Sequence, residues 1–161
     1  MTTLGKSLRK LTAADVMSRD LTLVPQEMSL PGAAHLLSRA GVSGAPVVDD
    51  KGRCVGVLST TDFVHFVGGL ESHYPQPPHG SAERVFDWQL ISGEPLPKDA
   101  VRSYMTCDPV TADLDTPVHL LAKCMLDAHI HRIVVVDADG HPTGVVSSTD
   151  ILAAVAYAEL A

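Results

Sequence analysis

Apolar residues recur with a helical period in two stretches of the chain. In each stretch four of them occupy positions i, i+3, i+4 and i+7, so they fall on one face of a helix. The members are Leu30, Ala33, Ala34 and Leu37 in the first stretch and Val118, Leu121, Ala122 and Met125 in the second. Gly41 follows the first stretch and suits a helix end. The pattern therefore predicts two amphipathic helices.

A pair of short apolar runs follows each predicted helix. Asp and Gly residues separate the members of each pair, which is typical of a tight turn between two strands. Strands are expected at residues 45–48 and 54–58 in the first pair and at 132–137 and 143–147 in the second. Each pair predicts a β-hairpin.

Shorter elements surround the hairpins. A β-type run at 21–24 stops at Pro25, and Thr12 is a capping residue that favours a short lead-in helix over 12–18. A further helix is expected after each hairpin, over 63–67 in the first half and 151–160 in the second. Each half thus follows the plan β-α-β-β-α.

The two halves are copies of one unit. The stretch from Gly56 to Asp62 recurs as Gly144 to Asp150, a spacing of 88 residues (150 − 62), and Met105 follows Met17 by the same interval. A unit of about 50 residues buries its apolar faces poorly alone. We therefore expect an α/β (α+β) fold in which two β-α-β-β-α units, related by pseudo-two-fold symmetry, pack sheet to sheet around a shared cleft.

The residues between the copies have no counterpart in either one. Their prolines, as in Pro75-Gln76-Pro77-Pro78, mark a connector, although 81–91 could be helical and the region of Trp88 is apolar enough to pack on a unit or a partner chain. The expected organisation is a lead-in segment over 1–20, a first unit over 12–68, a connector over 69–98 and a second unit over 99–161.

Composition and charge exclude several classes of protein. The chain has 161 residues, 45% of them hydrophobic, and 12 basic against 19 acidic residues give a formal charge of −7, which disfavours nucleic acid and anionic membranes as partners. No apolar run approaches the roughly 18 residues of a membrane span, and no secretory signal follows the basic start. Three scattered cysteines without a CxxC pair favour a reduced, cytoplasmic protein.

The repeated stretches carry the candidate chemistry. Ser59-x-x-Asp62 and Ser147-x-x-Asp150 each have the form of a capping box, in which the serine and the acidic residue satisfy each other's backbone N–H groups at a helix start. A helix start also attracts phosphate, and a carboxylate suits the paired hydroxyls of ribose. A nucleotide offers both groups at once.

The motif G-h-h-S-x-x-D, closing a β-α-β-β-α unit and preceded by stretches such as Ala45-Pro46-Val47-Val48-Asp49, resembles the cystathionine β-synthase (CBS) domain. The tandem pair looks like a stand-alone Bateman module. Residues 41–49 and 128–137 are also similar to stretches of the nucleotide-sensing γ subunit of AMP-activated protein kinase.

This resemblance implies two ligand sites in the cleft, each drawing on both units. Asp62 and Asp150 would hold ribose hydroxyls, and His131 and Arg132 would meet phosphates. Site 1 would comprise Ser59, Thr61, Asp62, Val110, His131, Arg132 and Ile133, and site 2 Thr22, Ser43, Gly44, Ala45, Ser147, Thr149 and Asp150. Because Ser43-Gly44 stands where the second copy has His131-Arg132, we expect site 1 to prefer a phosphorylated adenosine.

The function expected on these grounds is a regulatory, ligand-sensing module. Its ligand would be AMP, ADP or ATP, with S-adenosylmethionine and NAD open as alternatives and Mg²⁺ only together with ATP. The family implies a homodimer formed through the outer helices, and the regulated partner protein is unknown. No catalytic residues and no metal ligands are expected, since neither GxSxG nor HExxH occurs. A ligand-free dimerising adaptor is the alternative, followed by a cryptic metal-dependent enzyme.

Overall fold

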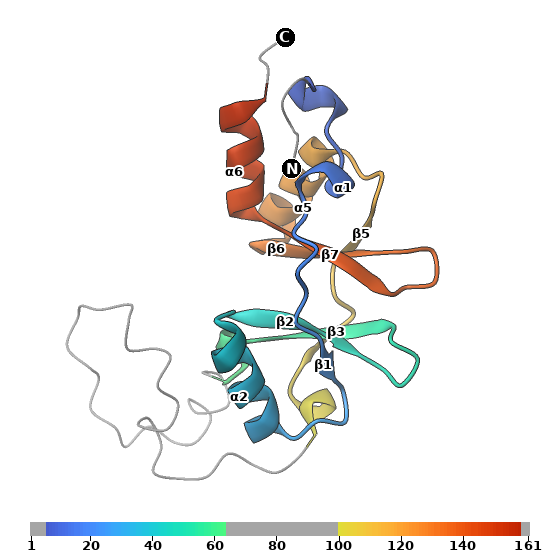
Figure 1. Ribbon diagram of the computed structural model, residues 1–161, viewed down its shortest axis with the longest axis vertical. Coiled ribbons are helices and arrows are strands. Elements are labelled where there is room, and N and C mark those ends of the chain that lie inside the picture. Colours follow the sequence, from blue (N-terminus) through green and yellow to red (C-terminus); the bar gives the residue numbers. More distant parts are fainter. Residues whose placement is uncertain (1–5, 64–99, 159–161) are drawn as a thin grey trace, which may run out of the picture. The chain divides into compact units, whose positions relative to one another are not determined.

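The computed structural model describes residues 6–63 and 100–158, which form two compact units (Figure 1). The central unit contains residues 22–49, 55–63 and 100–107, and the carboxyl-terminal unit contains 6–21, 50–54 and 108–158. The expected connector and its helix over 81–91, with Trp88, lie outside the described residues. The proposed boundaries at 68 and 98 stay predictions for the same reason.

The central unit is built on a four-stranded sheet with the order β1-β2-β3-β4. The strands are β1 (Val24–Pro25), β2 (Gly44–Val48), β3 (Cys54–Ser59) and β4 (Thr106–Cys107). β1 runs parallel to β2, while β4 runs antiparallel to β3. The strand predicted at 21–24 is thus shorter than expected: it begins at Val24 and ends with Pro25.

The helix α2 (Leu30–Ala40) covers one face of this sheet (Figure 1). Its start is capped by Ser29, whose hydroxyl accepts the N–H of Gly32 at 3.2 Å, and it ends at Gly41 with a φ of 66°. The four apolar positions of its predicted inner face are all buried. They share a core with Val24, Val47, Leu58 and Phe63, and with Val101 of the short 3₁₀ helix η3 (Val101–Ser103).

The carboxyl-terminal unit has a three-stranded sheet with the order β5-β6-β7. Its strands are β5 (Thr111–Asp113), β6 (Arg132–Val136) and β7 (Pro142–Ser147), with β5 parallel and β7 antiparallel to β6. α5 (Val118–Ala128) and α6 (Ser148–Tyr157) lie on the same face of this sheet (Figure 1). α6 begins three residues before the position predicted from its apolar pattern, because Ser147 caps it.

The lead-in segment belongs to the carboxyl-terminal unit. It forms a 3₁₀ helix η1 (Leu8–Lys10) and α1 (Ala13–Val16), and buries Leu11, Ala13 and Val16 in the same core as Leu121 and Val146. Asp15 closes the start of α1 by accepting the N–H of Thr12 at 2.9 Å. A hydrogen bond from Lys6, at 2.7 Å, is the main cause that lowers the pKa of the Asp15 carboxyl.

Each Met of the repeat packs on the Gly of the opposite copy. A Cβ built on Gly144 would meet Met17 and lie 3.0 Å from the carbonyl oxygen of Ser18, and one built on Gly56 would lie 2.5 Å from the Sδ of Met105. Ser18 and Val145 also exchange two backbone hydrogen bonds of 2.9 and 3.0 Å. The segment that precedes each copy in the sequence therefore packs on the other copy. Glycine is required at the point of contact because a side chain there would collide with this segment.

We predict that Gly144→Ala lowers the free energy of unfolding by about 1–3 kcal/mol, because the added methyl group overpacks this point of contact. Urea denaturation measures the change. Met17→Ala removes the side chain that the added methyl group would meet. In a double-mutant cycle the loss of stability caused by Gly144→Ala should therefore be smaller in the Met17→Ala background. Equal penalties in both backgrounds would show that the Met17 contact is irrelevant.

Candidate functional site

A capping box joins the end of β7 to the start of α6. Asp150 Oδ2 accepts the N–H of Ser147 at 2.7 Å and its hydroxyl at 2.9 Å, while the N–H of Asp150 donates to Ser147 Oγ at 3.2 Å. The reciprocal bonds hold the carboxylate beside the first turn of the helix. The capping-box interpretation of this copy is confirmed.

The earlier copy repeats the two carboxylate bonds of this geometry in the central unit. Asp62 Oδ2 accepts the N–H of Ser59 at 2.7 Å and its hydroxyl at 3.3 Å, and helical conformation begins at Thr60. Asp62 and Asp150 are both partly exposed. Each carboxylate is therefore fixed by a cap and still open to solvent, as a group that accepts ligand hydroxyls must be.

A backbone hydrogen bond also links the start of each helix to the residue that precedes the neighbouring strand. The N–H of Thr60 donates to the carbonyl of Ser43, and the N–H of Ser148 donates to the carbonyl of His131, both at 2.9 Å. Arg132 lies directly opposite Ser147 in the β6–β7 pair. Polar residues at the start of β2 and of β6 are thus held next to the cap of their own unit.

The structure divides the predicted site residues between the units. The carboxyl-terminal unit holds Val110, His131, Arg132, Ile133, Ser147, Thr149 and Asp150, and the central unit holds Thr22, Ser43, Gly44, Ala45, Ser59, Thr61 and Asp62. Each predicted site has members in both units, so its assembly stays a prediction. The geometry within a unit brings Arg132 beside Ser147 and Gly44 beside Ser59.

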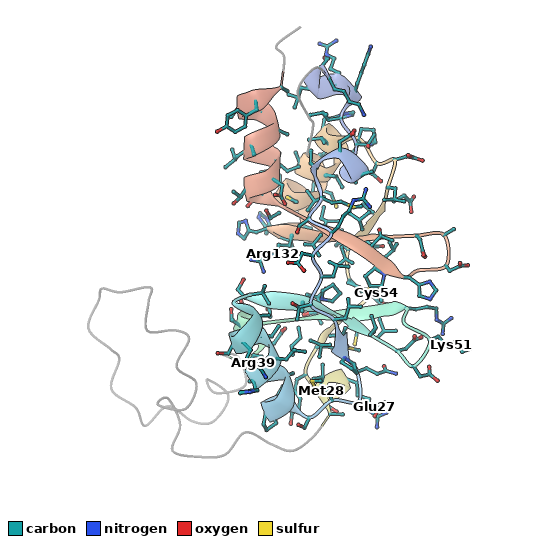
Figure 2. The ribbon with its side chains drawn as sticks, in the orientation of Figure 1. Glu27, Met28, Arg39, Lys51, Cys54 and Arg132 are labelled. Carbon is teal, nitrogen blue, oxygen red and sulfur yellow. The ribbon has the colours of Figure 1, made fainter. Side chains whose placement is uncertain are left out.

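The predicted site residues differ in how exposed their side chains are. The side chains of His131 and Arg132 are exposed (Arg132 is labelled in Figure 2). Ile133, 1% exposed, and Ala45, 3% exposed, belong to the apolar cores. Any contact of these two residues with a ligand would have to come mainly through the backbone.

A pocket that the sequence did not reveal lies between α5 and α6. It has a volume of about 420 Å³ and is lined by Ala122, Met125, Leu126, His129, Ile130, His131, Ser148, Ile151 and Leu152. His129 adopts a left-handed conformation with a φ of 54°, at the position where the first copy has Gly41. The replacement of Gly41 by His129 in the second copy was the sequence feature that could have drawn attention to this region.

A second polar cluster lies at the β6–β7 turn. Ligand atoms of Asp137, Asp139 and His141 fall within 4.8 Å of one another. However, Asp137 Oδ1 already accepts the N–H groups of Asp139 at 3.0 Å and His141 at 2.9 Å, and the bond from His141 is the main cause that lowers the pKa of Asp137. His141 Nε2 also lies 2.9 Å from the carbonyl of Lys51, in the turn between β2 and β3. Hydrogen bonds within the protein therefore account for the cluster.

The family model of the CBS domain matches residues 13–69 and 101–157. The chain therefore belongs to the CBS domain family, and its repeat is a CBS pair. The resemblance predicted from the two G-h-h-S-x-x-D motifs is confirmed, as is the mixed α and β fold class. No helix in the described parts of the chain is both long and apolar enough to cross a membrane.

Similar proteins include both short and longer chains. The uncharacterized protein MJ1426 of Methanocaldococcus jannaschii is 28% identical over 150 residues, which cover 87% of this chain and 88% of that protein. The γ subunit of the 5′-AMP-activated protein kinase of Kluyveromyces lactis is 30% identical over 94% of this chain, but the match spans only 42% of that subunit.

A solved structure of CBSX2, a protein of Arabidopsis thaliana, in complex with AMP has the same fold. Its TM-score is 0.68 and its sequence identity 27%, with 90% of this chain and 96% of that chain covered.

We predict that Asp150→Ala lowers the free energy of unfolding by about 1 kcal/mol in the absence of ligand, since it removes the acceptor of the Ser147 N–H. Thermal or urea unfolding detects the change. Thr149→Ala is the matched control: this neighbour is exposed and its truncation should stay within about 0.5 kcal/mol of the unmodified protein. Equal losses in the two variants would contradict a specific cap.

Proposed function

We propose that this CBS pair is a regulatory module that binds an adenosine-containing nucleotide. The observation that carries the proposal is the pair of capping boxes, each of which fixes a partly exposed carboxylate beside a helix start. The carboxylate is suited to ribose hydroxyls, and the helix start is suited to phosphate. The AMP complex of CBSX2 supports the choice of adenosine.

The two proposed sites differ in charge. Site 1 combines Asp62 with His131 and Arg132, and we infer that it prefers AMP, ADP or ATP, with Mg²⁺ only alongside ATP. Site 2 combines Asp150 with Ser43 and Gly44, which are small and carry no charge. S-adenosylmethionine and NAD share the ribose and adenine and remain alternatives to be tested beside the nucleotides.

Binding would regulate by shifting a conformational population. A ligand that contacts both units stabilises only those arrangements in which both sets of contacts form. A partner protein that recognises this arrangement would then respond to nucleotide concentration. This role requires no catalytic residues, and we propose that the protein acts in the cytoplasm as a sensor and not as an enzyme.

We predict that AMP or ATP raises the unfolding temperature of the purified protein in a saturable manner, because a ligand that binds only the folded state stabilises it, by about 2.7 kcal/mol at a hundredfold excess over Kd. The protein is first unfolded and refolded to remove any ligand bound during purification. Arg132→Ala should weaken binding about tenfold or more through the loss of a charged phosphate contact.

Arg39→Ala is the control for this measurement, since Arg39 is likewise exposed but lies on α2 (Figure 2). It should bind like the unmodified protein. Unchanged affinity in Arg132→Ala would remove Arg132 from the site. No stabilisation by AMP, ADP, ATP, S-adenosylmethionine or NAD would instead favour the adaptor.

One observation bears on dimerisation, which the alternative adaptor function requires. Apolar side chains remain exposed on α5 and α6, among them Leu126 at 75% and Leu152 at 68%, which line the pocket between these helices, and Tyr157 at 78%. Such a patch commonly marks a protein contact. We propose that it supports a homodimer, which is compatible with either function.

We predict that Leu152→Asp converts a dimer to a monomer, because a buried unpaired charge at an apolar interface is unfavourable. Sedimentation equilibrium measures the mass. Thr149→Asp, on the same helix but beside its capped start, provides a charge-matched control and should leave the mass unchanged. A monomeric unmodified protein, or a Leu152→Asp variant that stays dimeric, would contradict this use of the α5–α6 surface.

A further inference from the structure

Asp62 has a contact from outside the S-x-x-D motif that has no counterpart at Asp150. In the central unit the Thr106 hydroxyl donates to Asp62 Oδ1 at 3.4 Å. Ser18 occupies the matching place in the other unit, since it precedes Thr106 by the 88-residue interval of the repeat. Among the described residues no hydrogen bond joins Ser18 to Asp150, whose Oδ1 has no hydrogen-bond partner there.

Thr106 is held in this place by its backbone. It lies in β4 opposite Val57 of β3, and its carbonyl oxygen lies 2.8 Å from the position of a Cβ on Gly56. The side chain therefore needs no rearrangement of the chain to meet Asp62. Because Thr106 is exposed, its hydroxyl can also rotate away at modest cost.

The contact matters because the two oxygens of the Asp62 carboxylate have different tasks. Oδ2 accepts the N–H and the hydroxyl of Ser59 and so maintains the helix cap. Oδ1 is the oxygen left for ligand hydroxyls, and Thr106 donates to it. A ribose at Asp62 must share this oxygen with Thr106 or displace it, whereas a ribose at Asp150 meets an oxygen without a competitor.

We propose that Thr106 is a specificity-determining residue that weakens ribose binding at Asp62, so that the ribose contributes less to affinity at the Asp62 site than at the Asp150 site. This inference rests on the proposed nucleotide binding. It concerns the ribose alone, and the attraction of Arg132 for phosphate acts separately on the Asp62 site. The difference between Thr106 and Ser18, which lie outside the S-x-x-D motif, thereby gives the two motifs different affinities for ribose.

The test isolates each site and then removes the hydroxyl. Asp150→Ala leaves only the Asp62 site, and Asp62→Ala leaves only the Asp150 site. Calorimetric titration with AMP is carried out on each variant with and without Thr106→Val, which keeps the branched shape and removes the donor. Thr106→Ser, which retains the hydroxyl, controls for the loss of a methyl group.

In the Asp150→Ala background, Thr106→Val should strengthen AMP binding about threefold, as expected when one modest hydrogen bond no longer competes. Thr106→Ser should bind like its parent. In the Asp62→Ala background Thr106→Val should change nothing, and neither should Ser18→Val, because Ser18 makes no bond to Asp150. Unfolding temperatures confirm that each variant is folded.

Unchanged or weaker AMP binding in Thr106→Val, with Asp62 as the only site, would overturn the inference while leaving nucleotide binding intact. A weaker affinity would make Thr106 a ligand contact instead of a competitor. If the unmodified protein binds neither AMP nor ATP, the proposed function itself fails and the inference fails with it. The two failures are thus distinguished by the unmodified protein alone.

Discussion

The carboxylate that follows each hairpin by three residues is the group on which the local structure depends. By accepting the serine N–H it ends the strand, starts the helix and fixes its own position in one step. Asp150 does this for β7 and α6, and Asp62 does it where β3 passes into the following helix. Because Oδ2 alone completes the cap, Oδ1 is not needed for it, so the same residue can stabilise the fold and bind a ligand.

Local patterns in the sequence predicted most of the elements. The i, i+3, i+4, i+7 pattern located α2 and α5, and Asp-Gly turns located both hairpins, because these signals depend on neighbouring residues alone. The start of α6 was placed too late, since the apolar pattern begins at Ile151 while the cap begins the helix three residues earlier. The capping chemistry was visible in the sequence, and it is the better guide to where this helix starts.

The exchange of the lead-in segments could not be predicted in this way. The apolar character of Met17 indicates burial, but Gly56 and Gly144 are equivalent by sequence, and no local signal says which copy Met17 contacts. The contact that distinguishes Thr106 from Ser18 could not be predicted either, because it depends on a strand pairing that is remote from Asp62 in sequence. The assembly of sites from both units stays a prediction that rests on family resemblance.

Nucleotide binding by these motifs requires that the carboxylate oxygens outside the caps contact the ribose. A crystal structure of the protein grown with AMP would reveal that contact. Ribose hydroxyls are expected at hydrogen-bond distance, about 2.6–3.2 Å, from Oδ1 of Asp150 or of Asp62. AMP bound away from both carboxylates, or no AMP density at saturating concentration, would contradict this expectation.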